Sequence, residues 1–86
     1  MPDTNDETLA LQALVWTLAE PQRAMRLLDL TGLNPGDLRA SAGSRATLLA
    51  TLGFLEAHEP DLIECAAGLN IAPAELVAVR HRLEGA

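Results

Sequence analysis

The chain has 86 residues, of which 49% are hydrophobic and 21% are charged, and this composition excludes intrinsic disorder. A chain of this length has room for one small domain. It contains 17 leucines and 15 alanines but only three valines and two isoleucines. Because leucine and alanine favour helices whereas β-branched residues favour strands, the composition predicts an all-α fold.

The charge balance excludes some classes of partner. Six basic residues, all arginine, face twelve acidic residues, which gives a net charge of −6. Proteins that bind nucleic acids normally present a basic face, and anionic membrane surfaces attract basic segments. We therefore expect neither a nucleic acid nor a membrane as the partner.

Three features of the sequence predict a cytoplasmic protein. No apolar run approaches the roughly 20 residues that are needed to cross a bilayer. The first seven residues are polar and acidic, unlike a signal peptide. The one cysteine, Cys65, cannot form an intramolecular disulfide, which is consistent with a reducing compartment.

Prolines and glycines mark the expected helix boundaries. Residues 1–5 are predicted to form a flexible polar leader, and residues 6–86 a single helical domain. Proline fits the first turn of a helix, and glycine favours the position after the last turn. These residues predict a compact bundle of five to six short helices at about 6–19, 21–31, 35–42, 45–58, 59–68 and 73–84.

The turns between these helices carry capping residues. Gly32 follows the second expected helix and should adopt a positive φ. Asn34 is predicted to cap the third helix, with Pro35 in its first turn, and Ser44 to cap the fourth. The fifth helix should begin at Glu59-Pro60 and close at Gly68.

The first expected helix is apolar around most of its circumference. The spacing of three and four residues predicts an inward face made by Leu11, Leu14, Val15 and Leu18. A second apolar stripe, which includes Trp16, lies beside it. We therefore expect Trp16 to be largely buried against the fourth or the sixth helix.

Two segments, 8–42 and 47–84, resemble each other. Each begins with a stretch of fourteen residues from Thr-Leu to Glu-Pro, and each later contains Gly-Leu-Asn, at residues 32–34 and 68–70. One interpretation is a duplicated three-helix unit with a pseudo-twofold arrangement. The other is that helix-capping preferences alone place proline at helix starts and glycine at helix ends, and both interpretations stay open.

No motif indicates catalysis or a cofactor. The densest group of potential metal ligands is His58, Glu59, Asp61 and Cys65, but Pro60 interrupts the helical spacing that a metal pair needs. Asp61 and Glu64 are acidic neighbours that disfavour a Cys65 thiolate. There is no Gly-rich phosphate-binding loop or paired-carboxylate site. We expect no catalytic, cofactor-binding or metal site, and therefore no enzyme.

The glycine turns allow an alternative function. The turns at residues 32–34 and 68–70 permit a nucleic-acid-binding regulator that uses a helix-turn-helix. The helix after the second turn, however, begins Pro73-Ala74-Glu75, which offers an acid to base edges. We expect most arginines to form ion pairs along their own helices, as in Glu20 with Arg23, Arg26 with Asp29, and Arg80 with Glu84.

The apolar content favours a protein-interaction or regulatory module without catalysis. A chain of this size buries only about 60–65% of its unfolded surface, so some apolar surface stays available for an unknown protein partner or a homodimer. The candidate interaction patch contains the apolar residues that do not fit their helix's inward stripe: Met25, Leu30, Leu33 and Ile71. Leu33 and Ile71 occupy matching turns and would lie close together if the duplication is real.

Finally, the chain resembles a family of small bacterial helical proteins that is catalogued as a domain of unknown function. The most specific segment is Leu30-Thr31-Gly32-Leu33-x-Pro35-x-Asp37-Leu38-Arg39. Further matches are Ala13-Leu14-x-Trp16 with Glu20-Pro21, Leu52-x-Phe54-Leu55, Ala67-Gly68-Leu69 and Pro73, so the resemblance runs from Leu9 to Leu83. It implies a stand-alone cytoplasmic domain and brings no activity, ligand or site residue.

Overall fold

A computed structural model describes residues 4–85, which fold into α-helices with no strand among them. The all-α bundle predicted from the composition is confirmed. The helices are α1 (Thr4–Leu18), α2 (Pro21–Thr31), α3 (Pro35–Ala40), α4 (Arg45–Glu56), α5 (Glu59–Gly68) and α6 (Pro73–Glu84).

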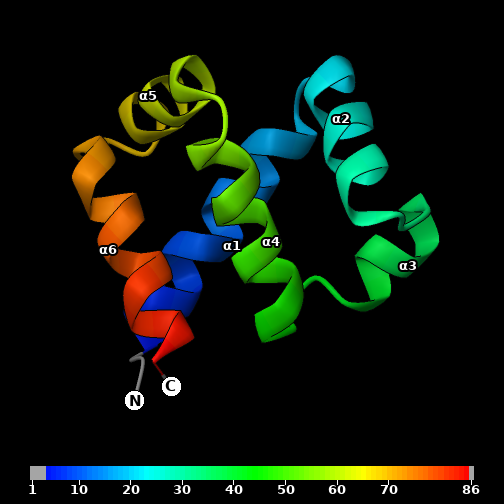
Figure 1. The fold of residues 1–86 in the computed structure, drawn as a ribbon, viewed down its shortest axis with the longest axis horizontal. Coiled ribbons are helices and arrows are strands. Elements are labelled where there is room, and N and C mark those ends of the chain that lie inside the picture. Colours follow the sequence, from blue (N-terminus) through cyan, green and yellow to red (C-terminus); the bar gives the residue numbers. More distant parts are fainter. Residues whose placement is uncertain (1–3, 86) are drawn as a thin grey trace.

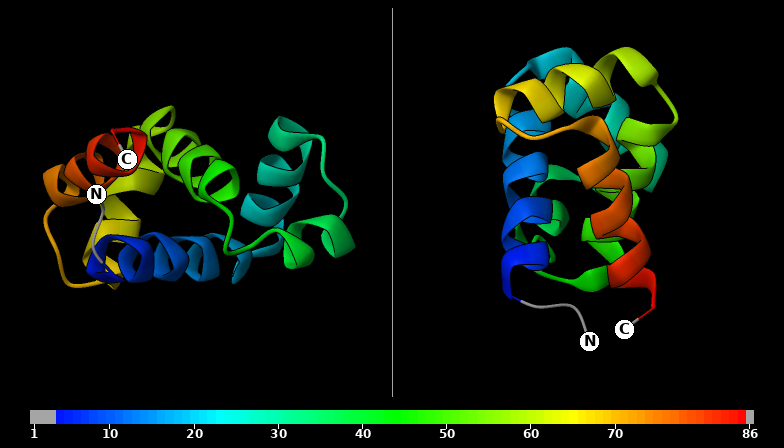
Figure 2. Two further views of the ribbon diagram at one scale, coloured as in Figure 1. Left: turned by 90° about the horizontal axis from the view of Figure 1, so that it is seen from below. Right: turned by 90° about the vertical axis from the view of Figure 1, so that its left-hand side faces the viewer.

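Four of the helices form the body of the molecule. α1, α4 and α6 pack against one another, and α5 packs across one end of this group (Figure 1). α2 and α3 form an arm on the side of α4 away from α6, and within this arm it is α2 that packs on α1 and α4. In Figure 2, α1 runs along one broad face of the molecule, whose dimensions are 28 × 26 × 17 Å.

The core is made of leucines and small residues from the four body helices. The arm contributes one fully buried leucine from each of its helices, Leu27 and Leu38. The buried apolar residues of the body are Ala10, Ala13, Leu14, Leu48, Leu52, Phe54, Leu55, Cys65, Ala66, Leu76, Val79 and Leu83.

Three of the predicted helix caps, at Gly32, Asn34 and Ser44, are confirmed. Gly32 has a φ of 73°, and its N–H donates to the carbonyl oxygen of Leu28 at 2.8 Å. Asn34 Oδ1 accepts a hydrogen bond of 2.8 Å from the N–H of Asp37, and Pro35 occupies the first turn of α3. Ser44 Oγ accepts from the N–H of Thr47, the third residue of α4, at 3.2 Å.

Several predicted boundaries differ from the structure. α1 begins at Thr4, so the last two residues of the expected leader are helical, whereas residues 1–3 lie outside the described residues. α3 and α4 each end two residues before the predicted position. At the end of α5, Gly68 is still helical, and the positive φ of 61° belongs to Asn70.

The predicted inward face of α1 is wrong except at Leu14. The buried positions are Asp6, Ala10, Ala13, Leu14 and Thr17, whereas Leu11, Val15 and Leu18 are exposed. The reason is that small side chains let α1 lie close to its neighbours, and the two buried alanines serve this purpose. Thr17 can share the buried face because its hydroxyl donates to the carbonyl oxygen of Ala13 at 2.8 Å.

Polar contacts join α1, α4 and α6 at the end of the body away from α5 (Figure 1). The Arg82 guanidinium near the end of α6 lies 2.8 Å from the carboxylate of Asp6 in α1 and 3.2 Å from that of Glu75. Arg45 in α4 donates to the backbone carbonyl of Glu84 at 2.8 Å. The start of α1 and the end of α6 are therefore fixed side by side.

The proposed duplication stays a prediction. α6 packs on both α1 and α4, but its counterpart α3 does not pack on the body in the same way. The sequence-related helices thus have different surroundings, even though their caps are similar.

Within residues 4–85, no individual helix has the length and apolar character to cross a membrane. Only α5 and α6 taken together, with a bend of 98° between them, meet those criteria.

Candidate functional site

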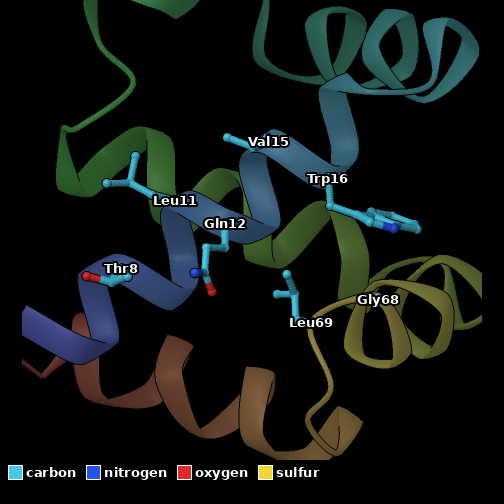
Figure 3. A pocket seen from close by; sticks show the side chains of 7 residues that line it. All are labelled: Thr8, Leu11, Gln12, Val15, Trp16, Gly68 and Leu69. Carbon is cyan, nitrogen blue, oxygen red and sulfur yellow. The ribbon is translucent and has the colours of Figure 1, made fainter.

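An apolar groove lies between α1 and the turn that joins α5 to α6. Its volume is about 540 Å³. Figure 3 shows α1 along one side of the groove and the end of α5 on the other. The lining residues are Thr8, Leu11, Gln12, Val15, Trp16, Gly68 and Leu69.

Large apolar side chains of α1 lie at the groove and just beyond it: Leu11 and Val15 line the groove, and Leu18 follows outside it. Leu11, Val15 and Leu18 follow one another at spacings of four and three residues, which places them along one side of a helix. Their exposed fractions are 37%, 66% and 38%. In Figure 3, Leu11 and Val15 point away from Leu69, whereas Gln12 points into the opening. We call these three exposed residues the outer stripe of α1.

Trp16 closes one end of the groove. The guanidinium carbon of Arg23 lies 3.7 Å from the centre of the indole ring, and Arg23 Nη2 donates to the carbonyl oxygen of Trp16 at 2.8 Å. On the α5 side, a Cβ added at Gly68 would lie 3.1 Å from two atoms of the indole. The tryptophan ring thus approaches the α5 backbone so closely that a side chain at position 68 would have to displace it slightly.

This placement corrects the prediction that Trp16 is largely buried against α4 or α6. The ring is partly buried, and it packs between Arg23 of α2 and Gly68 of α5. Trp16 follows the exposed Val15, so it sits at the border between the inner and outer sides of α1. Nothing in the residues around Trp16 indicates the stacked arginine, which comes from the next helix.

Both sides of the groove lack charged residues. One side belongs to residues 8–19 and the other to residues 65–74, and neither segment contains an Asp, Glu, Lys or Arg. A third uncharged segment, residues 46–55, forms most of α4, which is largely buried. The two groove segments differ from residues 46–55 because part of their uncharged surface is exposed.

The interaction patch predicted from the sequence is distributed over separate places. Met25 and Leu30 are exposed on α2, at 61% and 63%. Leu33 and Ile71 are partly buried and pack against the core. The turns that carry these last two residues lie at opposite ends of the molecule (Figures 1 and 2), so the structure does not bring Leu33 and Ile71 together.

Sequence reasoning missed the outer stripe because it assigned those residues to the core. A usable signal was present in the small residues of the same helix. Ala10, Ala13 and Thr17 also follow a spacing of three and four residues, which is the pattern of a closely packed helix face. The larger side chains of Leu11, Val15 and Leu18 were predicted to face the core because they are more hydrophobic than alanine and threonine.

The groups weighed for metal binding and nucleophilic chemistry have structural roles. Asp61 is buried, and its Oδ2 lies 3.0 Å from Arg26 Nη2 and 2.9 Å from His58 Nδ1. Cys65 is fully buried, and burial raises the pKa of its thiol to about 11. Across residues 4–85, no three His, Cys, Asp or Glu side chains come together as a metal site would require.

The arginine contacts differ partly from the expected pairs. Arg26 pairs with Asp61 of α5 and not with Asp29, so it ties the arm to the body. The Glu20 carboxylate accepts hydrogen bonds from the backbone N–H groups of Gln22 and Arg23 and thereby caps α2. The expected pair of Arg80 with Glu84 is confirmed, and Arg80 also pairs with Glu56 of α4.

The starts of α3 and α6, which follow the two glycine turns, do not support the helix-turn-helix alternative. α3 has only six residues, which is short for a recognition helix. In the first turn of α6, the carboxylate of Glu75 accepts a hydrogen bond of 3.2 Å from Arg82. This end of α6 therefore presents an acid where base readout would use polar or basic side chains.

Comparison with known proteins supports the resemblance seen in the sequence. No curated protein and no solved structure matches the chain. Residues 3–86 match the family described as "Protein of unknown function (DUF3572)". The chain, which forms six helices and an uncharged groove within residues 4–85, therefore belongs to this family of proteins of unknown function.

Proposed function

We propose that this protein is a non-catalytic interaction module that docks another protein surface on the outer stripe of α1 and the adjoining groove. The observation that carries the proposal is the arrangement of α1, which keeps alanines inside and exposes Leu11, Val15 and Leu18. Folding alone favours the opposite arrangement, because burying the larger side chains would remove more apolar surface from water.

The size of the exposed apolar surface supports this function. Complete burial of a valine or leucine side chain is worth about 1.5–3 kcal/mol, and two thirds of Val15 is still exposed. Trp16 adds an aromatic side chain at the end of the groove, and tryptophan is among the residues most often found to dominate binding energy at interfaces. A partner that covers this surface would gain several kcal/mol from apolar burial alone.

The absence of charge on both sides of the groove indicates the chemistry of the partner. Electrostatic complementarity steers partners that carry opposite charge, and residues 8–19 and 65–74 offer none for such steering. The surface that fits is a neutral apolar one, such as the apolar side of a helix. Association through this groove should therefore not weaken when salt is added, unlike binding to nucleic acid.

Site-specific photo-crosslinking in cells tests the proposal. A benzophenone amino acid is placed at position 15, and the matched control carries it at position 25, since Met25 is as exposed as Val15 but lies on α2. We expect protein adducts from position 15 and few from position 25. No adduct at position 15, or equal adducts at both positions, would overturn the proposal.

A further inference from the structure

We infer that the surface docked on the outer stripe of α1 is the same stripe of a second copy of this chain, which makes the protein a homodimer. The inference rests on the proposed function and specifies its partner. It is carried by the distribution of charge, the place of the stripe and the groove on one face, and the area available.

The distribution of charge favours this occupant. Each copy carries a net charge of −6, so two copies repel each other over most of their surfaces. The face around α1 is different, because its exposed residues from Thr8 to Leu18 are all uncharged. The end of α5 and the turn after it extend this neutral region to residue 74. A twofold contact through these residues therefore brings no charged side chain of this segment against its copy.

The stripe and the groove share one face of the molecule. Leu11 and Val15 of the outer stripe line the groove, and Val15 is the most exposed member of the stripe (Figure 3). In a twofold dimer the same patch of both subunits meets. A twofold axis near Val15 would therefore set the outer stripe of each copy against that of the other, with the two α1 helices crossing.

The area is sufficient for such a dimer. The lower end of specific interfaces is about 600 Å² per partner, roughly one eighth of the 4849 Å² surface of this molecule. α1 lies along a broad face of 28 × 26 Å (Figure 2) and has 15 residues, or about 22 Å of helix. An interface of this size and apolar character is consistent with a dimer that dissociates on dilution.

Solution mass across a concentration series tests the inference. Light scattering and sedimentation equilibrium should give a mass that rises from one chain to two as the wild-type protein is concentrated. Val15→Glu places a carboxylate from each copy at the interface and should weaken the dimer at least tenfold. Leu18→Glu is a second variant on the same stripe, and Met25→Glu is the control of equal charge, which should associate like the wild type.

Each result bears on the inference separately from the proposed function. A wild-type protein that stays monomeric at all concentrations overturns the dimer, and so does a dimer that Met25→Glu weakens as much as Val15→Glu. If the wild type is monomeric but position 15 crosslinks to a different protein, the dimer is wrong and the proposed function stands. A crosslinked adduct of two copies of this chain at position 15 supports both.

Discussion

The two sides of α1 differ in a way that folding alone does not explain. The inner side, with Ala10, Ala13 and Leu14, is fully buried and contains two of the smallest apolar residues. The outer side, with Val15 as its most exposed member, keeps large apolar residues in contact with water. Both sides belong to the same uncharged segment of the chain.

This difference shows that apolar residues serve two purposes within one helix. On the inner side, small residues allow close approach to neighbouring helices, and the packing there determines stability. On the outer side, Val15 adds little to the folded monomer because two thirds of its surface stays exposed. Substitutions on the two sides should therefore affect different measurements.

The largest difference in stability is expected between substitutions at Leu14 and Val15, which are neighbours in sequence but lie on opposite sides of α1. Leu14→Ala removes a buried side chain and should lower the free energy of unfolding by about 2–5 kcal/mol. Val15→Ala, one residue later, should change it by about 0.5 kcal/mol or less, because surface substitutions are usually of this size. Urea unfolding followed by circular dichroism measures both. Equal losses for the two variants would contradict the distinction between the sides.

Enlarging an inner residue should have the next largest effect. Ala13→Leu adds volume where α1 meets the core, and overpacking of this kind costs about 1–3 kcal/mol. The matched control is Ala19→Leu, since Ala19 is exposed just beyond the end of α1. Thermal unfolding should show a clear loss for the first variant and almost none for the second. Unchanged stability in Ala13→Leu would mean that the inner side is not closely packed.

A smaller effect is expected at the end of the groove. Gly68→Ala places a Cβ 3.1 Å from the Trp16 ring, so the ring must move outward by a few tenths of an ångström. Alanine is also the better helix former by up to about 1 kcal/mol, which offsets part of the cost. We expect a change in stability of about 1 kcal/mol or less and a red shift of the tryptophan emission. Emission identical to that of the wild type would argue against the close contact.

The smallest effect on stability is expected at Glu20, which follows α1 and caps α2. Hydrogen bonds from the N–H groups of Gln22 and Arg23 hold the pKa of Glu20 below its ordinary value of 4.5. The folded state therefore favours the carboxylate, whose stabilising contribution is complete above pH 4.5 and is lost as the pH falls through the lowered pKa. Glu20→Gln should lower the melting temperature slightly at neutral pH and not at strongly acidic pH. A difference that stays constant across a series of melts at different pH would contradict this role.

The sequence predicted the fold because local chemistry determines helix ends. Gly32 has the positive φ expected of the residue after a helix, and Asn34 and Ser44 make the expected capping hydrogen bonds. These interactions involve residues within four positions of one another, so spacing along the chain is enough to recognise them. The predicted helix boundary differs from the observed one by two residues at the end of α4, where no capping side chain marks the end.

The candidate site could not be predicted in the same way. α1 is apolar around most of its circumference, so periodicity alone does not say which side faces the core. That choice depends on α4 and α6, which begin more than 30 residues later in the chain. The contacts of Trp16 with Arg23 and Gly68 have the same origin, because they form only when α2 and α5 have packed.

The most direct test of the account uses the one tryptophan of the chain, since Trp16 lines the groove. Acrylamide quenching of its fluorescence is measured as the wild-type protein and Val15→Glu are concentrated. If two copies meet on this groove, Trp16 becomes less accessible in the wild type as the dimer forms, while its accessibility in Val15→Glu stays constant. Association of the wild type without any change in the quenching of Trp16 would contradict the claim that the groove on α1 is the docking surface.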